Sequence, residues 1–402
     1  MFKSLSLKVI IFGFIFTFFS SFGQSFFLGI FNPSIRNELS ITHGQFGSIY
    51  ASATLASSFL LIWVGKKIDD IDISKFALFV ILLLAFSCFF FSKISSISFL
   101  FIAIFLMRFS GQGMMSHTAT TTISRYFTKS RGKALSTGWF GLSAAEFILP
   151  VLMIYFLSIT DWKNIWIIIS IIVLIFLPSI SFILIKNLNF DSREEAKDNA
   201  INYDNYKQWK RIEVIKDYRF YIVCANMLAM PSIATGCFIY QSFILSSKNW
   251  GPYVIAQSFM SYSILSVITL IFSGFLIDKF TSKKILIYMN IPLFFAAMVL
   301  FYFDKPFSSF VFFGLIGITN GLCNVLGSST WAEIYGVKYI GSIKALSTSL
   351  MVFATAFGTA IFGILIDAGF SIEQISLVSA TYISISIISL FFIRKNLNPT
   401  KI

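Results

Sequence analysis

The chain has 402 residues, of which 56% are hydrophobic and only 12% are charged. An ordinary soluble domain carries about 25% charged residues, so this composition cannot supply a water-exposed surface. It excludes a soluble globular protein and indicates helices that lie in a lipid bilayer. The net charge of +13 does not indicate nucleic-acid binding, because the longest polar stretch, residues 186–217, mixes acidic and basic side chains.

Twelve apolar runs are long enough to cross a bilayer as helices, which takes about 20 residues each. Charged or turn-forming residues bound every run, and segment 186–217 separates the first six runs from the last six. The pattern therefore predicts an all-α membrane protein with twelve transmembrane helices. The predicted spans are 8–31, 46–64, 75–92, 98–123, 134–158, 163–185, 218–246, 253–277, 284–303, 307–331, 341–366 and 372–393.

The first run has two interpretations. It begins after Lys3 and Lys8, and the small residues from Ser21 to Gly23 could end a secretory signal peptide. The apolar sequence continues past this point through Ile30, which favours an uncleaved first span. We expect this run to remain in the protein as a transmembrane helix.

The basic residues predict the orientation, because cytoplasmic loops of membrane proteins are enriched in lysine and arginine. With both termini in the cytoplasm, 25 of the 31 basic residues fall on cytoplasmic segments and Arg108 lies within a span. We therefore expect a multi-pass protein of the cytoplasmic (inner) membrane. The outer loops hold only Arg36, Lys93, Lys163, Lys248 and Lys305.

Two unrelated motifs recur at nearly the same offset. Gly65-x-x-x-Asp69 ends the second span and Gly274-x-x-x-Asp278 ends the eighth, while the string Lys-Ala-Leu-Ser-Thr begins at Lys133 and again at Lys344. We infer that six spans were duplicated, and because six is an even number both copies have the same orientation. Parallel repeats are typical of transporters that rock two halves around a central site. The predicted domains are an amino-terminal six-helix bundle (1–185), a cytoplasmic linker (186–217) and a carboxy-terminal six-helix bundle (218–402).

With these features the chain resembles the major facilitator superfamily over nearly its whole length. Gly65 to Asp69 resembles the loop between spans 2 and 3 of that family, and Arg108 to Gly113 resembles its span-4 motif. Ile123 to Ala134 is similar to the junction before span 5 in monocarboxylate transporters and oxalate/formate antiporters. The resemblance implies the major facilitator fold and a secondary active transporter, a symporter or antiporter, that moves a small organic anion by alternating access. Residues 259–277 lack the acid–arginine pair that such carboxylate carriers place in span 8.

Two charged residues lie deep within predicted spans, Arg108 in span 4 and Glu146 in span 5. A charge at membrane depth costs about 2.5 to 3.5 kcal/mol on insertion scales, so it must face the helix bundle or a water-filled cavity. One interpretation is a structural ion pair between neighbouring helices. The other is functional: Arg108 receives an anionic substrate, and exchange of Arg108 between Glu146 and the substrate couples a proton to transport.

Other polar side chains within the spans are candidates for substrate binding or for hydrogen bonds between helices, because amides inside a membrane need partners. His117 follows Arg108 by about two and a half turns, which points it to the opposite side of span 4. The candidate substrate-binding residues, with Arg108, are Gln24, His117, Gln241, Asn320 and Asn324.

The repeated motifs predict an inner gate. A carboxylate can stabilise the amino-terminal end of a helix, and the family resemblance implies that Asp69 meets the start of span 11 and Asp278 the start of span 5. Basic residues near those helix starts would add charge-assisted bonds. The candidate gating residues are Gly65, Asp69, Gly274, Asp278, Arg131, Lys133 and Lys344.

We expect no enzyme activity, no metal and no cofactor, because the sequence has no phosphate-binding loop and no convergent acid, base or metal ligands. The expected partners are a small-molecule solute, protons and the lipid bilayer, with a monomeric protein and no nucleic acid. Two alternatives remain open at this point: an exporter of drugs or metabolites, and a membrane sensor that has lost transport.

Overall fold

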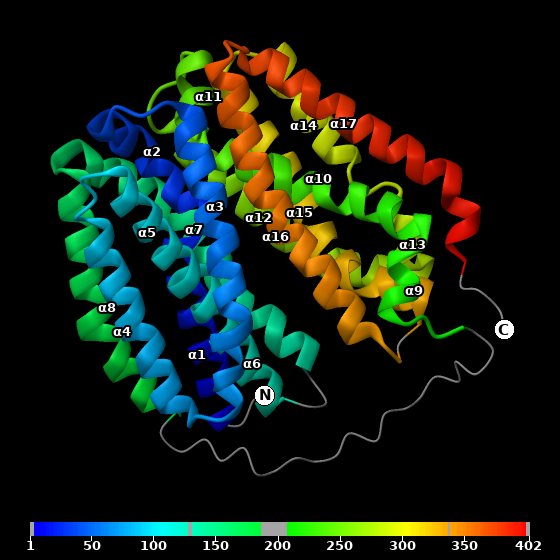
Figure 1. Cartoon of the computed structure of the whole chain (residues 1–402), viewed down its shortest axis with the longest axis horizontal. Helices are drawn as coiled ribbons and strands as arrows, with labels where there is room; N and C mark the ends of the chain where they lie inside the picture. Colours follow the sequence, from blue (N-terminus) through cyan, green and yellow to red (C-terminus); the bar gives the residue numbers. More distant parts are fainter. Residues whose placement is uncertain (1–3, 128–130, 186–206, 337, 399–402) are drawn as a thin grey trace. The chain divides into compact units, whose positions relative to one another are not determined.

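The structure is a computed structural model that describes residues 4–127, 131–185, 207–336 and 338–398. Throughout these ranges the chain forms helices joined by short connections, and no strand occurs in them (Figure 1). Twelve helical stretches have the length and hydropathy to cross a membrane. The predicted all-α fold with twelve transmembrane helices is therefore confirmed.

The chain divides into two compact units, Met1–Asp198 and Asn199–Ile402. Each unit contributes six of the twelve candidate spans. The predicted linker 186–217 lies across this division, and its residues 186–206 are outside the described part of the chain.

In unit 1, two of the six spans are interrupted. The first span consists of two α-helices separated by a single 3-10 turn, and the fourth changes from α-helix to a π-helical segment, η3, and back. The elements are α1 (Ser4–Ser20), η1 (Ser21–Gly23), α2 (Ser25–Leu39), α3 (His43–Val64), η2 (Gly65–Asp69), α4 (Ile73–Phe91), α5 (Ile97–Met107), η3 (Arg108–Met115), α6 (Ser116–Tyr126), α7 (Arg131–Ile159) and α8 (Trp162–Ile185).

Local sequence explains where several helices of unit 1 begin. Thr42 and Gln45 form a reciprocal capping box before α3, and the Asp72 carboxylate accepts the backbone N–H groups of Ser74 and Lys75 before α4. Such side chains satisfy the amide groups that the first helical turn leaves without partners.

Unit 2 has longer uninterrupted helices, and its first span ends in a break before a short helix, α11. Its elements are α9 (Arg211–Ile215), α10 (Tyr218–Ile239), α11 (Gln241–Ser247), α12 (Val254–Phe280), α13 (Ser282–Leu286), α14 (Ile291–Tyr302), α15 (Pro306–Tyr335), α16 (Ile340–Asp367), α17 (Ile372–Ile393) and η4 (Arg394–Leu397).

The last residues of the predicted linker pack against unit 2. The backbone N–H of Trp209 donates to the carbonyl of Tyr335 at 3.1 Å, and the two rings lie 5.5 Å apart. Val214 in α9 is fully buried in the same apolar cluster. The side chain of Gln208 occupies the space that a Cβ atom would take at Gly336, which has φ +84°. Residues 208–214 are thus part of the folded carboxy-terminal unit.

Candidate functional site

The break in the first span brings its backbone against span 4. A Cβ atom on Gly23 would collide with the carbonyl oxygen of Met107 and the backbone nitrogen of Gln112, and one on Gly111 would lie 2.7 Å from the nitrogen of Gly23. Only glycine at both positions permits this approach. Gly141 of α7 likewise meets the carbonyl of Phe14. The small residues of spans 4 and 5 therefore pack largely against span 1.

Arg108 is held where these two interrupted spans meet. It is 3% exposed and is the first residue of η3, a π-helical segment of the kind often found at functional sites. Its Nη1 donates to the carbonyl of Gly23 at 3.0 Å, at the point where span 1 leaves helical geometry. The break thus provides a backbone acceptor that an uninterrupted helix would have used internally.

Tyr50 of α3 completes this site, and sequence reasoning missed it. The Arg108 guanidinium lies 5.3 Å from the centre of the Tyr50 ring, and Tyr50 is fully buried. Among the described residues, neither Nε of Arg108 nor the hydroxyl of Tyr50 has a hydrogen-bond partner, and neither does the hydroxyl of Thr54, one turn further along α3. A buried donor without a partner is uncommon in proteins. The Arg108 Nε–H and the Tyr50 hydroxyl, side by side in one buried site, mark a place where an acceptor can bind.

Glu146 lies separately in α7. It is 8% exposed, and within the described part of the chain it forms neither a hydrogen bond nor an ion pair. Pro150 follows it by one turn, and because proline has no N–H, the backbone carbonyl of Glu146 lacks its usual helical donor. A carboxyl group and a free carbonyl therefore occupy the same buried turn.

The ion pair considered from the sequence is not formed. Arg108 binds the Gly23 carbonyl and faces Tyr50, and no Arg108 nitrogen lies within the 4.0 Å ion-pair distance of a Glu146 oxygen. The π-helical segment η3 changes the helical rise and rotation between Arg108 and the end of span 4, so sequence spacing does not place Arg108 relative to Glu146. Arg108 and Glu146 are therefore unpaired in this conformation, and the roles of both residues stay predictions.

The two glutamine candidates occupy equivalent breaks. Gln24 is the residue between η1 and α2, with extended backbone geometry, and Gln241 begins α11 directly after the break in span 7. The buried Gln241 amide donates to the carbonyl of Phe238 at 2.9 Å. Each glutamine thus lies at the break between the two helices that form the first span of its unit.

The asparagine candidates differ from each other. The amide of Asn320 donates to the hydroxyl of Ser266 at 2.9 Å, a bond between α15 and α12. Asn324, one turn later, is exposed. The structure thus places Asn320 in a contact between helices and leaves the amide of Asn324 at the surface of unit 2.

His117 lies against the loop that the sequence assigned to the gate. Its Nε2 is 3.0 Å from the carbonyl oxygen of Gly65. Because a carbonyl can only accept, this bond requires a proton on Nε2. Arg125, two turns later on α6, donates to the carbonyl of Ile68 at 3.1 Å. Two side chains of α6 therefore hold the 3-10 turn η2.

The repeated Gly-x-x-x-Asp motif takes two conformations. Gly65 begins the 3-10 turn η2, whereas Gly274 lies inside α12, with open space where its Cβ would be. Among the basic gating candidates, Lys133 is exposed on α7 and Lys344 is half-buried on α16. The side chains of Asp69, Asp278 and Arg131 lie outside the described residues.

In unit 2, Glu333 forms hydrogen bonds with the segment that follows the second span of that unit. Sequence reasoning did not identify this residue. The Glu333 carboxylate at the end of α15 accepts the backbone N–H groups of Ser282 at 2.8 Å and Lys283 at 3.2 Å. It therefore caps the start of α13 from a neighbouring helix.

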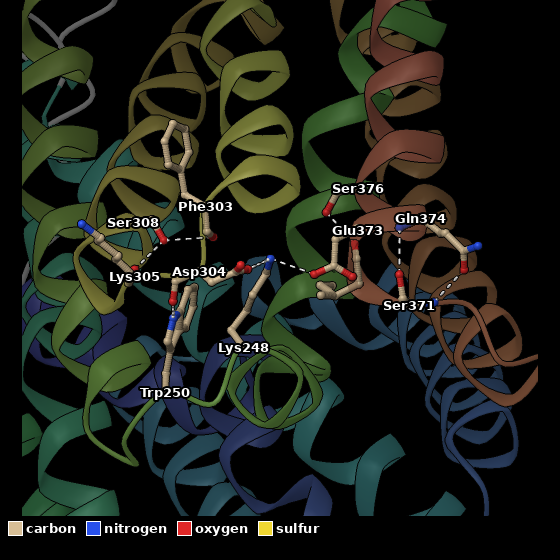
Figure 2. Close-up of polar contacts among 11 residues, drawn as sticks. Lys248, Trp250, Phe303, Asp304, Lys305, Ser308, Ser371, Glu373, Gln374 and Ser376 are labelled. Atoms are coloured by element: carbon tan, nitrogen blue, oxygen red, sulfur yellow. Dashed lines mark hydrogen bonds and ion pairs between the residues drawn. The ribbon is translucent and has the colours of Figure 1, made fainter.

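A charged cluster joins three connections at the other end of unit 2. Lys248 has a side chain that is only 1% exposed, and its ammonium lies 2.6 Å from Asp304 and 2.8 Å from Glu373 (Figure 2). Trp250 adds a bond from its indole N–H to the carbonyl of Asp304 at 2.6 Å. Burial opposes the charge on Lys248, but the bonds to both carboxylates outweigh it and raise the pKa of the lysine. Sequence reasoning counted Lys248 only as an outer-loop residue.

Within the residues that the structure describes, no group of three histidine, cysteine, aspartate or glutamate side chains could hold a metal ion. Cys88, Cys224, Cys237 and Cys323 are free thiols.

Comparisons with known proteins identify the family. The sequence pattern of the Major Facilitator Superfamily matches residues 13–359. In overall structure the chain is similar to a bacterial homolog of the human lysosomal transporter Spinster, with a TM-score of 0.73, 12% identity, and 99% of this chain and 98% of that chain covered. It is also similar to the nucleoside transporter NupG, with a TM-score of 0.72, 14% identity, and 98% and 99% covered. These identities establish a shared fold alone.

No curated protein matches the chain. The family match spans most of its length, agrees with the twelve candidate spans and implies that a small-molecule solute is the substrate. The chain belongs to the major facilitator superfamily and is a multi-pass membrane transporter of the secondary kind rather than an enzyme.

Proposed function

We propose that this transporter carries a small organic carboxylate and that the solute binds at Arg108 and Tyr50. The observation that carries the proposal is the buried Arg108 guanidinium, which keeps one donor without a partner beside an equally unpartnered phenol. A carboxylate offers two acceptor oxygens and a negative charge, so it can satisfy both donors and neutralise the guanidinium. The local resemblance of Ile123 to Ala134 to carboxylate carriers supports the same class of solute.

We propose that Glu146 couples a proton to this transport. A charged carboxylate buried without a cation is destabilising, and no ion-pair partner for Glu146 occurs among the described residues. A proton is the simplest group that neutralises it. Transport would then be proton-coupled, as symport or antiport. Glu146 would bind a proton when the site faces one side of the membrane and release it when the site faces the other side.

The remaining proposals concern placement in the membrane. The distribution of basic residues supports an inner-membrane protein with both termini and segment 186–217 in the cytoplasm. On this orientation the turn from Gly65 to Asp69 and the last turns of α12, from Gly274 to Asp278, face the cytoplasm and close the inner gate through Asp69 and Asp278. We propose that the protein does this as a monomer whose two six-helix bundles are joined by the linker.

A ligand-stabilisation screen of the purified protein tests the solute class, because a ligand that binds only the folded state raises the unfolding temperature. The panel contains monocarboxylates, dicarboxylates, amino acids, nucleosides and lipophilic cations. We expect carboxylates to stabilise the wild-type protein and to have no effect on Arg108→Gln. Stabilisation by lipophilic cations alone would instead favour a drug exporter, and an equal response of Arg108→Gln would remove Arg108 from the solute site.

Reconstituted vesicles test the proton role with the carboxylate that the screen identifies. We expect Glu146→Gln to exchange labelled for unlabelled solute across the membrane but to lose accumulation driven by a pH gradient. Normal accumulation by Glu146→Gln would exclude Glu146 as the coupling group. Binding without any flux in the wild-type protein would indicate a sensor.

A further inference from the structure

Unit 1 contains a large crevice between the start of α4 and the end of α8, away from the Arg108 site. The two helices run side by side (Figure 1), and the crevice between their ends has a volume of about 450 Å³. Its rim is polar and its walls are apolar. The lining residues are Ser74, Lys75, Leu78, Ile81, Pro178, Ser179, Ser181, Phe182 and Ile185.

The polar groups at this crevice have no partners among the residues that the structure describes. Lys75 forms no ion pair, and the hydroxyls of Ser74, Ser179 and Ser181 form no hydrogen bond with the described part of the chain. Several other serines in the spans bond to backbone carbonyls, as Ser170 does to Ala85 at 2.7 Å. An ammonium and three hydroxyls are therefore available to a ligand.

The neighbouring acidic groups do not neutralise Lys75. The Asp72 carboxylate accepts the backbone N–H groups of Ser74 and Lys75 as the cap of α4, and Asp70 pairs with Lys67 at 3.7 Å. Lys66 lies 5.9 Å from the ring of Trp63. Among the described side chains, the Lys75 ammonium therefore keeps its charge without a carboxylate partner.

The deeper wall is apolar and lies within the membrane span. Leu78 and Ile81 follow Lys75 by one and two turns, so the wall continues for about 9 Å along α4. Leu78 is 44% exposed and Phe182 is 54% exposed, which suits contact with hydrocarbon. A free phosphate ion would use only the rim, whereas an amphiphile would use both the rim and the wall.

We infer that this crevice binds an anionic phospholipid, with the phosphate at Lys75 and the serine hydroxyls and an acyl chain along Leu78, Ile81 and Phe182. Lysine near a membrane surface attracts anionic headgroups. On the orientation proposed above, the lipid belongs to the cytoplasmic leaflet. It would stabilise the α4–α8 contact without entering the transport site.

The test is the affinity of the full-length protein for phosphatidylglycerol and for phosphatidylcholine of the same chain length, measured by native mass spectrometry. We expect the wild-type protein to prefer phosphatidylglycerol and Lys75→Gln to bind it about fivefold more weakly. Lys75→Arg should retain the preference. Ser181→Leu, which fills the crevice, should weaken the binding of both lipids.

The matched control is Lys93→Gln, because Lys93 is an exposed lysine at the opposite end of the same helix. We expect it to leave phosphatidylglycerol binding unchanged. Equal losses in Lys75→Gln and Lys93→Gln would show general charge attraction and overturn the site. Full displacement of the lipid by inorganic phosphate would also overturn it, because the rim alone would then account for binding.

Discussion

The two units of this transporter place their charges differently. Unit 1 buries Arg108 and Glu146 within its spans, whereas the charged residues in the spans of unit 2 lie near the span ends, as Glu373 does at the start of α17. In unit 2 such charges have partners, as in the Lys248 cluster. Placing a charge at membrane depth costs free energy. In the described part of unit 1, Arg108 and Glu146 do not form an ion pair that would offset this cost. On the proposed function, unit 1 carries its buried charges for transport, whereas the charges of unit 2 serve folding.

The comparison also extends to the loop after the second span of each unit. In unit 1, donors on α6, His117 and Arg125, hold backbone carbonyls of η2. In unit 2, an acceptor on α15, Glu333, holds the backbone N–H groups of α13. The Gly-x-x-x-Asp motif therefore lies at the same place in both units, but different hydrogen bonds hold the segment near it.

The largest expected effect concerns the cluster in unit 2. Replacing both carboxylates, as Asp304→Asn with Glu373→Gln, leaves the buried Lys248 ammonium without a charge partner, and we expect a loss of about 3 kcal/mol in the free energy of unfolding. Lys248→Met should lower the free energy of unfolding less, because the side chains left without their partner, Asp304 and Glu373, are 77% and 37% exposed. Denaturant unfolding in detergent measures both. A larger loss in Lys248→Met would contradict the assignment of the lysine as the buried member.

The next effect concerns the phenol in unit 1. Tyr50→Phe keeps the ring beside Arg108 but removes the unpartnered hydroxyl, so we expect about tenfold weaker binding of the carboxylate, equivalent to about 1.4 kcal/mol. Titration calorimetry with the solute from the screen measures it. The matched control is Tyr262→Phe in unit 2, which should leave affinity unchanged. Unaltered affinity in Tyr50→Phe would exclude the hydroxyl from the solute site.

A smaller effect on local stability distinguishes η2 in unit 1 from the start of α13 in unit 2. His117→Ala removes one bond to η2, and Glu333→Gln weakens the cap of α13, so each should lower local stability by about 1 kcal/mol. Hydrogen exchange should show faster opening near residues 65–71 in the first variant and near 282–286 in the second. Faster exchange at both loops in either variant would show that their support is shared.

The smallest effect depends on pH. The backbone N–H of Lys210 and the ammonium of Lys207 bond Glu213 and hold the pKa of its carboxyl below the ordinary value. The stabilisation is therefore present above the unfolded pKa and is lost as pH falls through the lower folded value. We expect residues 207–215 to loosen in acid, as measured by hydrogen exchange corrected for intrinsic rates. Glu213→Gln should remove this pH dependence, and an acid transition that persists in Glu213→Gln would assign it to another group.

Sequence alone predicted the spans because apolar length is a local property, and it identified Arg108 and Glu146 because a charge within an apolar run is unusual. It could not predict that they are apart, since the break at Gly23 and the π-helical segment redirect Arg108. Tyr50 was missed because its role depends on a contact between α3 and η3 that no spacing reveals. The partners of Lys248 are distant in sequence, so its burial depends on tertiary structure.

The most direct test of the central claim is the thermal unfolding midpoint of the double variant Arg108→Met with Glu146→Gln. If these buried groups serve transport, replacing them loses one hydrogen bond to Gly23 but relieves the burial of the Arg108 charge and of the Glu146 carboxyl, neither of which has an ion-pair partner among the described residues. We therefore predict a midpoint equal to or above that of the wild-type protein. A midpoint lower by several degrees would show that Arg108 and Glu146 stabilise the fold and would contradict the division of roles between the two units.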